Sequence, residues 1–323
     1  MLSLIWSENI WIIFITKMKS SSSSIKEIIR DAKKGKMFIL VDNKDRENEG
    51  DLVVPAAKAN PKKINFMAKH GRGLICLALT SSKVKKLNLP LMSSVNKSRT
   101  QTAFTISIES KTGVTTGISA HDRAKTIKVA IQPKSNRHSI VSPGHVFPLV
   151  AKDGGVLERA GHTEASVDIS KLAKLNPSAV ICEVMNQDGR MARLNDLIKF
   201  SKKHRIKIGS ISDLIAYRIK NEKLINDTSS RYIKLGKYDN LILKTFTNKL
   251  DNSKSFVLKK GNFSSRVAIP VRVISIKVKK NFLYGNKQIM RNLNFLNKFK
   301  NYALILIEDK KSKKEKILEQ FSK

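Results

Sequence analysis

The chain has 323 residues, of which 62 are Lys or Arg and 26 are Asp or Glu, a formal net charge of +36. A hydrophobic fraction of 41% and a charged fraction of 27% exclude wholesale disorder, a collagen-like repeat and a polytopic membrane protein. At roughly 150 residues per domain, the length predicts two domains. Cys76 and Cys182 are too few for a disulfide framework or a four-thiolate zinc site, so we expect a reducing, cytoplasmic setting.

The positive charge is spread along the whole chain. A large surplus of this sign attracts nucleic-acid phosphates or anionic membranes. A composition generally rich in Lys, Ile and Asn gives the same charge, and no run combines basic residues with regularly spaced aromatic ones. We therefore expect neither nucleic acid nor membrane as a partner, although a basic nucleic-acid-binding protein without catalysis stays an alternative.

The first 17 residues differ from the rest of the chain. Leu2–Thr16 is apolar but is interrupted by Glu8, is too short to span a bilayer and lacks an early basic region. Met18 and the serine run after it fit the start of a folded chain. We predict that residues 1–17 are a non-native or disordered extension and that the first domain covers residues 18–220.

Helices and strands are expected to alternate from residue 25 to about Tyr217, which predicts a mixed α/β or α+β domain. Helix caps, stops and first-turn residues are present at Ser24 and Gly35, at Asn60 and Pro61, and at Ser119 with Asp122 for a helix through Ile131. The expected strands are Met37–Val41, Leu52–Ala56, Leu74–Leu79, Thr102–Ile108, Val146–Val150 and Ala179–Met185.

Glycine becomes sparse after residue 217 and Lys-rich segments become frequent. We predict a second, smaller domain over residues 221–323. Its expected strands are Val271–Val278 and Tyr302–Glu308, and a charged tail follows from Asp309.

An acidic segment, Asp42–Asp51, reads DNKDRENEGD and holds five carboxylates in ten positions. Such crowding is self-repulsive unless a cation or a basic partner is present, and oxygen ligands suit a hard metal ion. A solvated acidic hairpin loop explains the same segment equally well.

A second cluster favours the metal interpretation. Gly161, Arg159 and Thr163 precede a helical pattern that starts at Ala165, and these residue types make a phosphate-binding site at a helix start. His162 lies among them and could join the carboxylates on a metal ion.

Three further segments have the residue types of a site. Thr115–Ser119 offers hydroxyls and amides ahead of a helix, which suits either phosphate binding or a plain turn. Pro143–His145 precedes a strand. Glu183 lies in an apolar strand, where partial burial would raise its pKa for proton transfer; alternatively it is an edge-strand residue that faces water.

Six motifs in order give the chain a family resemblance over about residues 25–217. The motifs are RENEGD (46–51), TAFT (102–105), GVTTGISA (113–120), PGHVFPL (143–149), RAGHTEA (159–165) and ICEVMNQDGRMAR (181–193). With these motifs the chain resembles the 3,4-dihydroxy-2-butanone 4-phosphate synthases of riboflavin biosynthesis.

The resemblance implies an α+β, three-layer mixed-sheet domain. It also implies a lyase that converts ribulose 5-phosphate to 3,4-dihydroxy-2-butanone 4-phosphate and formate with Mg²⁺ or Mn²⁺. The implied metal ligands are Glu47 and His162, and the implied acid/base groups are His145 and Glu183. A homodimer is implied as well. The residues implied to hold the sugar phosphate are Arg46, Glu47, Asp51, Arg159, Ala160, Gly161, His162, Thr163 and Glu183.

The second domain weakly resembles GTP cyclohydrolase II. Val271–Ser275 is similar to a strand of that family, and Tyr284–Asn286 is similar to a later motif. That family needs three cysteines for zinc, and this part of the chain has none. We therefore predict a degenerate, smaller α/β domain without zinc, kept for packing, dimer contacts or regulation. A bifunctional enzyme with a working cyclohydrolase is the weakest alternative.

Overall fold

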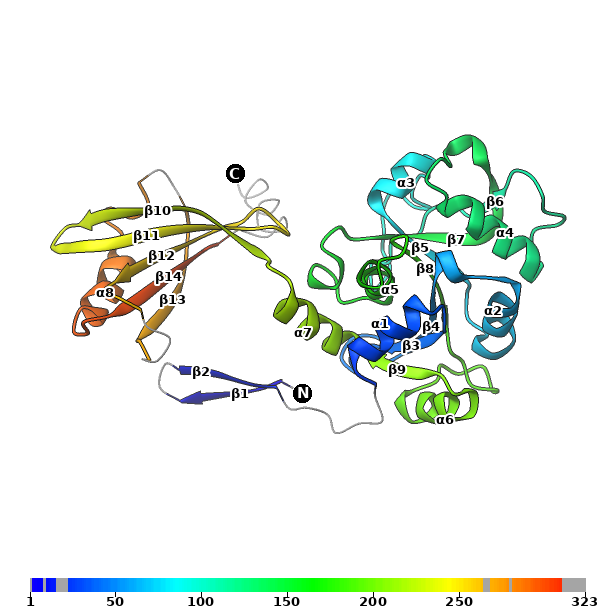
Figure 1. Ribbon diagram of the computed structural model, residues 1–323, viewed down its shortest axis with the longest axis horizontal. Helices are drawn as coiled ribbons and strands as arrows, with labels where there is room; N and C mark the ends of the chain where they lie inside the picture. Colours follow the sequence, from blue (N-terminus) through cyan, green and yellow to red (C-terminus); the bar gives the residue numbers. More distant parts are fainter. Residues whose placement is uncertain (1, 8–9, 16–22, 264–267, 279–280, 310–323) are drawn as a thin grey trace. The chain divides into compact units, whose positions relative to one another are not determined.

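The computed structural model describes residues 2–7, 10–15, 23–263, 268–278 and 281–309 (Figure 1). The chain divides into two compact units, Met1–Lys220 and Asn221–Lys323. Strands β1 (Leu2–Ser7) and β2 (Ile10–Ile15) pair antiparallel near the amino end. The expectation that residues 1–17 are an extension outside the native domain stays a prediction.

The first unit is built on a seven-stranded mixed sheet of order β6-β7-β5-β8-β4-β3-β9. Parallel pairing joins β3 to β9 and β5 to β7, and the other neighbours are antiparallel. Strand β8 therefore lies inside the sheet. The strands are β3 (Phe38–Val41), β4 (Gly50–Pro55), β5 (Cys76–Thr80), β6 (Ile108–Ser110), β7 (Ile140–Ala151), β8 (Ser178–Glu183) and β9 (Lys207–Ser210).

Helices cover both faces of this sheet (Figure 1). Successive side chains of a strand point to opposite faces, so neighbouring residues enter different cores. Val53 packs in one core against α1 (Ile25–Lys33), α5 (His162–Leu172) and α7 (Ile211–Asn221). Leu52 packs in the other, with residues of four further helices. Those helices are α2 (Pro61–Phe66), α3 (Ser81–Leu87), α4 (Ala120–Ile131) and α6 (Leu194–His204). The predicted three-layer α+β fold is confirmed.

Short helical turns complete the unit. They are 3-10 turns at Ala56–Lys58, Arg137–Ser139 and Gly155–Leu157, and a π-helical turn at Met67–Gly71.

Local signals identified several elements correctly. Ser24 caps α1 and accepts a hydrogen bond from the Glu27 amide, Asn60 caps α2, and Ser119 caps α4. Each cap satisfies backbone N–H groups that the first helical turn leaves free.

The predicted strand Thr102–Ile108 is wrong. Only Ile108 belongs to a strand, β6, and Phe104 and Thr105 form isolated bridges. The Thr105 amide donates to the Pro148 carbonyl at 3.0 Å. Because Pro148 has no N–H to donate in return, a regular ladder with β7 cannot form there.

The second unit holds a five-stranded sheet of order β10-β11-β12-β14-β13. Helix α8 (Lys287–Leu296) connects β13 to β14, which pair in parallel, and packs on one face through Ile289, Leu293 and Leu296. The strands are β10 (Ile225–Leu235), β11 (Tyr238–Asn248), β12 (Lys254–Lys260), β13 (Val271–Ile276) and β14 (Tyr302–Glu308). The predicted tail after Asp309 lies outside the described residues.

Within the described ranges, no helix has the length and apolar character needed to cross a membrane.

Candidate active site

The candidate site lies at one end of the first sheet, on the face covered by α5. Asp51 of β4 pairs directly with Glu183 of β8. Phe147 of β7 and Ile181 of β8 both pair with Cys76 of β5. His145 and Glu183 are each two residues further along in the same direction. Because residues two apart in a strand share a face, Asp51, Glu183 and His145 all project from the α5 face at this end.

The acidic loop between β3 and β4 is organised by Asp42, whose side chain is 1% exposed. Its Oδ2 accepts from Arg46 Nη1 at 2.8 Å and from the Glu47 amide at 3.1 Å, and its Oδ1 accepts from the Glu49 amide at 2.9 Å. From outside the loop, Arg193 Nη1 donates to the Glu47 carbonyl at 2.8 Å. The loop is a hairpin between β3 and β4 that is held closed by Asp42, and its residues 43–45 are exposed.

His162 is the first residue of α5 and is 6% exposed. Its Nδ1 lies 3.5 Å from Glu47 Oε2 and 4.0 Å from Asp51 Oδ1. Arg46 Nη1 lies 2.5 Å from the same Glu47 oxygen. His162 Nε2 is buried and has no hydrogen-bond partner among the described residues. The structure thus brings together Glu47 and His162, as predicted, and adds Arg46 and Asp51 beside them.

Charges in this cluster strongly shift one another. The hydrogen bond from His162, together with the Arg46 charge, lowers the pKa of Glu47 to about 2. Burial opposes a charge on the His162 imidazole, but Asp51 and Glu47 outweigh it and raise the pKa of His162 to about 9. Burial raises the pKa of Asp51 to about 7, although the His162 charge opposes this rise. Several carboxyls thus share limited positive charge, as expected of a cation site.

A metal ion fits these residues. Asp42, Glu47 and His162 each offer a ligand atom, and the three atoms lie within 4.8 Å of one another. The imidazole nitrogen that faces the Glu47 carboxylate is His162 Nδ1, at 3.5 Å. Carboxylate oxygens with one imidazole suit Mg²⁺ or Mn²⁺ better than soft, thiolate-binding metals.

The amino end of α5 is arranged for an anion. The helix begins at His162, three residues earlier than the sequence pattern predicts, and its N-cap Gly161 makes no side-chain cap. Free first-turn amides and the helix dipole favour negative charge. Arg159 donates to Glu164 Oε2 at 2.6 Å and to Thr102 Oγ1 at 2.9 Å. A Cβ on Gly161 would lie 2.3 Å from the Arg159 guanidinium, so a larger residue would have to displace the end of that side chain. Substrate binding by residues 159–163 stays a prediction.

Glu183 is half-buried, and its Oε2 accepts from the Leu74 amide at 2.9 Å. Because β8 lies between β5 and β4, the alternative of an edge-strand glutamate is wrong. A Cβ on Gly73 would lie 2.5 Å from Glu183 Oε2 and 2.6 Å from its backbone nitrogen. The backbone before β5 thus approaches this carboxyl closely.

Sequence reasoning missed one residue near the site and left the role of one segment open. His145 Nδ1 lies 3.1 Å from Oε2 of Glu109, a β6 residue outside the six motifs. In the segment Thr115–Ser119, the Thr115 hydroxyl and the Gly117 amide both donate to Asp122 of α4. That segment acts as part of a helix cap, which favours the plain-turn interpretation over a phosphate site.

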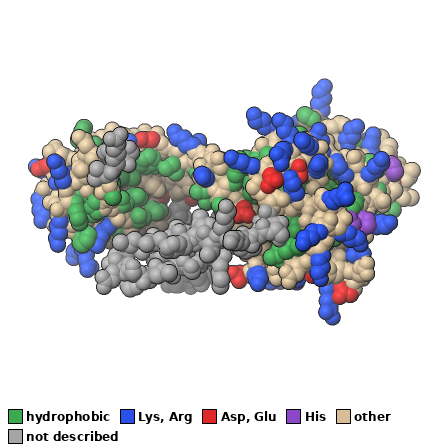
Figure 2. Space-filling model, turned by 60° about the horizontal axis from the view of Figure 1, so that its bottom comes forward, with side chains coloured by type: hydrophobic (Ala, Val, Ile, Leu, Met, Phe, Trp, Pro, Cys, Tyr) green, Lys and Arg blue, Asp and Glu red, His purple; other side chains and the backbone are tan. Residues whose placement is uncertain are grey.

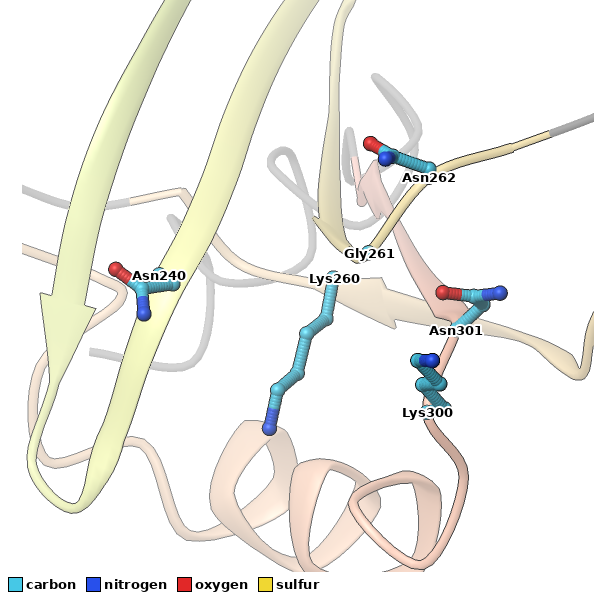
Figure 3. Close-up of a pocket in the computed structure, with 6 residues that line it drawn as sticks. All are labelled: Asn240, Lys260, Gly261, Asn262, Lys300 and Asn301. Atoms are coloured by element: carbon cyan, nitrogen blue, oxygen red, sulfur yellow. The ribbon is translucent and has the colours of Figure 1, made fainter.

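The second unit has a pocket of about 420 Å³ (Figure 3). It contains no carboxyl or imidazole group, and its titratable lining residues are Lys260 and Lys300. Its lining residues are Asn240, Lys260, Gly261, Asn262, Lys300 and Asn301.

In this three-layer fold, carboxylates, an imidazole and the amino end of a helix lie together at one end of the sheet. Such a site defines a metal-dependent acid–base enzyme. Comparison with known families then gives the particular one. Residues 26–217 match the model for 3,4-dihydroxy-2-butanone 4-phosphate synthase, and the chain belongs to that family. This family membership confirms the predicted lyase activity on ribulose 5-phosphate in riboflavin biosynthesis.

Relatives extend the similarity beyond this domain. The chain is 48% identical to the 3,4-dihydroxy-2-butanone 4-phosphate synthase of Photobacterium phosphoreum. The alignment spans 253 residues, which are 78% of this chain and 69% of that protein. The chain is 49% identical over 255 residues to the riboflavin biosynthesis protein RibBA of Aquifex aeolicus, which covers 78% of this chain and 63% of that protein.

Solved structures agree. RibBX of A. baumannii, described as a two-domain 3,4-dihydroxy-2-butanone 4-phosphate synthase, is 40% identical with a TM-score of 0.75, over 90% of this chain and 83% of that one. A synthase in complex with two magnesium ions is 36% identical with a TM-score of 0.59, over 62% of this chain and 98% of that one. A second, carboxyl-terminal domain like that of RibBX is thus confirmed.

Proposed function

We propose that this protein converts ribulose 5-phosphate to 3,4-dihydroxy-2-butanone 4-phosphate and formate with Mg²⁺ or Mn²⁺ held by Asp42, Glu47 and His162. The observation that carries the proposal is the 3.5 Å approach of His162 Nδ1 to Glu47 Oε2, from segments far apart in the sequence. Such a bound cation stabilises negative charge on neighbouring substrate oxygens.

The remaining residues have separate roles in this proposal. The free amides at the start of α5, in the segment Arg159–Thr163, bind the phosphate, and Arg46 and Asp51 hold the sugar. Glu183 and His145 project from one sheet face and exchange protons with the substrate, since a proton must leave a carbon beside the carbonyl and later steps return protons. Support comes from the shared face and from the Leu74 amide, which fixes the Glu183 carboxyl at 2.9 Å.

The direct test is formate release from ribulose 5-phosphate. We expect turnover with Mg²⁺, loss of turnover with a chelator, and recovery with Mg²⁺ or Mn²⁺. Glu47→Ala should lower kcat/KM by more than about 100-fold, because even residues that only support metal ligands contribute about 10–100-fold. Asp239→Ala, which removes an exposed carboxylate of the second unit, is the control. A folded Glu47→Ala protein with near wild-type turnover would refute the metal assignment.

We propose in addition that residues 221–323 form a degenerate GTP cyclohydrolase II-like domain. The absence of cysteine from this part of the sequence supports the proposal. The purified chain should contain no stoichiometric zinc and should leave GTP unchanged. Bound zinc together with GTP consumption would contradict it.

We also propose that the protein acts as a homodimer in the cytoplasm, as the family resemblance and the two buried, unpaired cysteines suggest. Light scattering on the purified chain should give twice the monomer mass; a monomer that is fully active would contradict the dimer.

A further inference from the structure

The carboxylate of Glu109 lies next to the proposed acid/base residue His145. Glu109 Oε2 lies 3.1 Å from His145 Nδ1, and the His145 side chain is 44% exposed. One ring nitrogen therefore faces a carboxylate of the protein. The other ring nitrogen, Nε2, points away from that contact by the geometry of the imidazole ring.

Glu109 is largely buried, and its carboxyl group contacts His145. Its side chain is only 13% exposed, and its Oε1 is buried with no hydrogen-bond partner among the described residues. Its carboxyl group therefore has no competing contact in the described chain that would draw it away from His145.

Two glycines allow the close approach. Gly117 has φ +88°, a conformation that favours glycine, and a Cβ there would lie 1.7 Å from Glu109 Oε1. The Gly117 amide is fixed by a 3.1 Å hydrogen bond to Asp122. A Cβ on Gly144 would lie 2.2 Å from the Ile108 carbonyl group, so glycine lets β7 come close to β6 just beside His145. The backbone on both sides is thus arranged around the Glu109 carboxylate.

We propose that Glu109 is a positioning residue, which holds His145 in the tautomer with the proton on Nδ1 and leaves Nε2 free to exchange a proton with the substrate. A carboxylate at one imidazole nitrogen stabilises the proton there and the imidazolium that forms when the other nitrogen accepts one. This proposal rests on the proposed acid/base role of His145.

The first experiment measures the tautomer itself. Two-dimensional ¹⁵N NMR of the full chain with labelled histidine, with the His145 signal identified from its loss in His145→Gln, should show a protonated Nδ1 and an unprotonated Nε2 when the ring is neutral. The Glu109→Gln side chain can donate its amide N–H to Nδ1 instead and should move the proton to Nε2. Glu109→Asp, which keeps a carboxylate, should keep the wild-type tautomer.

Kinetics give the second readout. Glu109→Gln should lower kcat for formate release by about 10- to 10⁴-fold, the range known for partners that orient a functional histidine. KM should change less than about threefold, because Glu109 does not hold the substrate in this proposal. Glu109→Asp should recover part of kcat, and Asp188→Asn, at an exposed loop carboxylate, should leave it unchanged.

Two outcomes would overturn the inference. One is a wild-type His145 protonated on Nε2, which needs no variant to fold. The other is a folded Glu109→Gln protein with the wild-type tautomer and undiminished kcat. If instead the wild type releases no formate, the proposed function fails, while the tautomer measurement still decides whether Glu109 holds His145.

Discussion

Asp42 is the residue on which the geometry of the acidic loop depends. Its two carboxyl oxygens accept hydrogen bonds from the Arg46 side chain and from the amides of Glu47 and Glu49. One side chain thus sets the position of the carboxylate that faces His162. A change at Asp42 would therefore displace the proposed ligand Glu47 in addition to removing the Asp42 carboxylate itself.

Asp42→Asn should weaken Mn²⁺ binding by at least about 10-fold. The amide keeps the shape, but it has only one acceptor oxygen and no charge for Arg46 or for a cation. Calorimetric titration of the purified variant with Mn²⁺ would measure the change, with Asp188→Asn as the comparison. Equal affinities in the two proteins would argue against any role of Asp42 at the metal.

The site could be predicted only in part at this scale. Glu47 and His162 were recognisable because they occur in dense motifs of site-type residues. Glu109 was not, because it is a single acid in an apolar, alternating segment, and only the close approach of β6 and β7 brings it to His145. The Pro143–His145 motif, which lies within β7 and not before a strand as predicted, indicated the histidine without its partner.

At the scale of elements, α4 is tied to the loop before it through Asp122. The Asp122 carboxyl accepts from the Thr115 hydroxyl at 2.8 Å and from the Gly117 amide at 3.1 Å. These hydrogen bonds, that from the Thr115 side chain above all, lower the pKa of Asp122 below its usual 3.8. The start of α4 and the segment Thr115–Gly117, which lies against Glu109, therefore form one structural unit.

The lowered pKa of Asp122 gives a pH-dependent contribution to stability. Because the folded state favours the ionised carboxyl, the contribution is fully present above the unfolded value of about 3.9 and is lost as pH falls through the lower folded value. Asp122→Asn should be less stable than the wild type at pH 7, and the difference should shrink below about pH 4. Urea unfolding at both pH values would measure it; a difference that grows in acid would contradict the assignment.

A second element-scale prediction concerns the backbone before β5. In Gly73→Ala, the new Cβ would lie 2.5 Å from Glu183 Oε2 and 2.6 Å from the Glu183 backbone nitrogen and carbonyl oxygen. Either the Leu74 amide or the Glu183 carboxyl must move. Because small displacements of reacting groups lower the rate, kcat should fall by about 10-fold or more. Formate release and thermal melting, measured together, would separate a local effect from unfolding. Unchanged kcat would mean that Glu183 need not be held in this position.

Elements were predictable where their signals are local. The N-caps of α1, α2 and α4 could be predicted from the cap residue and its close neighbours in the sequence, and the structure confirms them. The strands β10–β12 were missed because most of β10 is exposed and its polar residues lack alternation. Whether a segment such as Thr102–Ile108 becomes a strand depends on a distant neighbour, here Pro148, which no local pattern reveals.

At the scale of the whole molecule, all the proposed site residues belong to the first unit, which has its own two cores. The second unit has a separate core around Tyr238, Tyr302 and α8. On the face drawn in Figure 2, Lys and Arg side chains are scattered over both units and do not form one continuous stripe. The expectation that nucleic acid is not a partner stays a prediction.

Residues 18–220 alone should therefore release formate with a kcat within about threefold of the full chain. Neither core of this unit includes a described residue of the second unit, so its stability should come from its own buried apolar surface. Expression of both proteins and the same assay would test it. A folded but inactive piece would show that the second unit contributes to catalysis.

The alignment of Asp51, Glu183 and His145 on one sheet face limits how this enzyme can change. A single-residue insertion or deletion within β4, β7 or β8 would turn every later side chain of that strand toward the opposite core. An acidic or imidazole group would then enter an apolar layer while an aliphatic residue took its place at the proposed site. Length variation among descendants of this sequence should accordingly be confined to the connections, and the strands should tolerate replacement but not gain or loss of a residue.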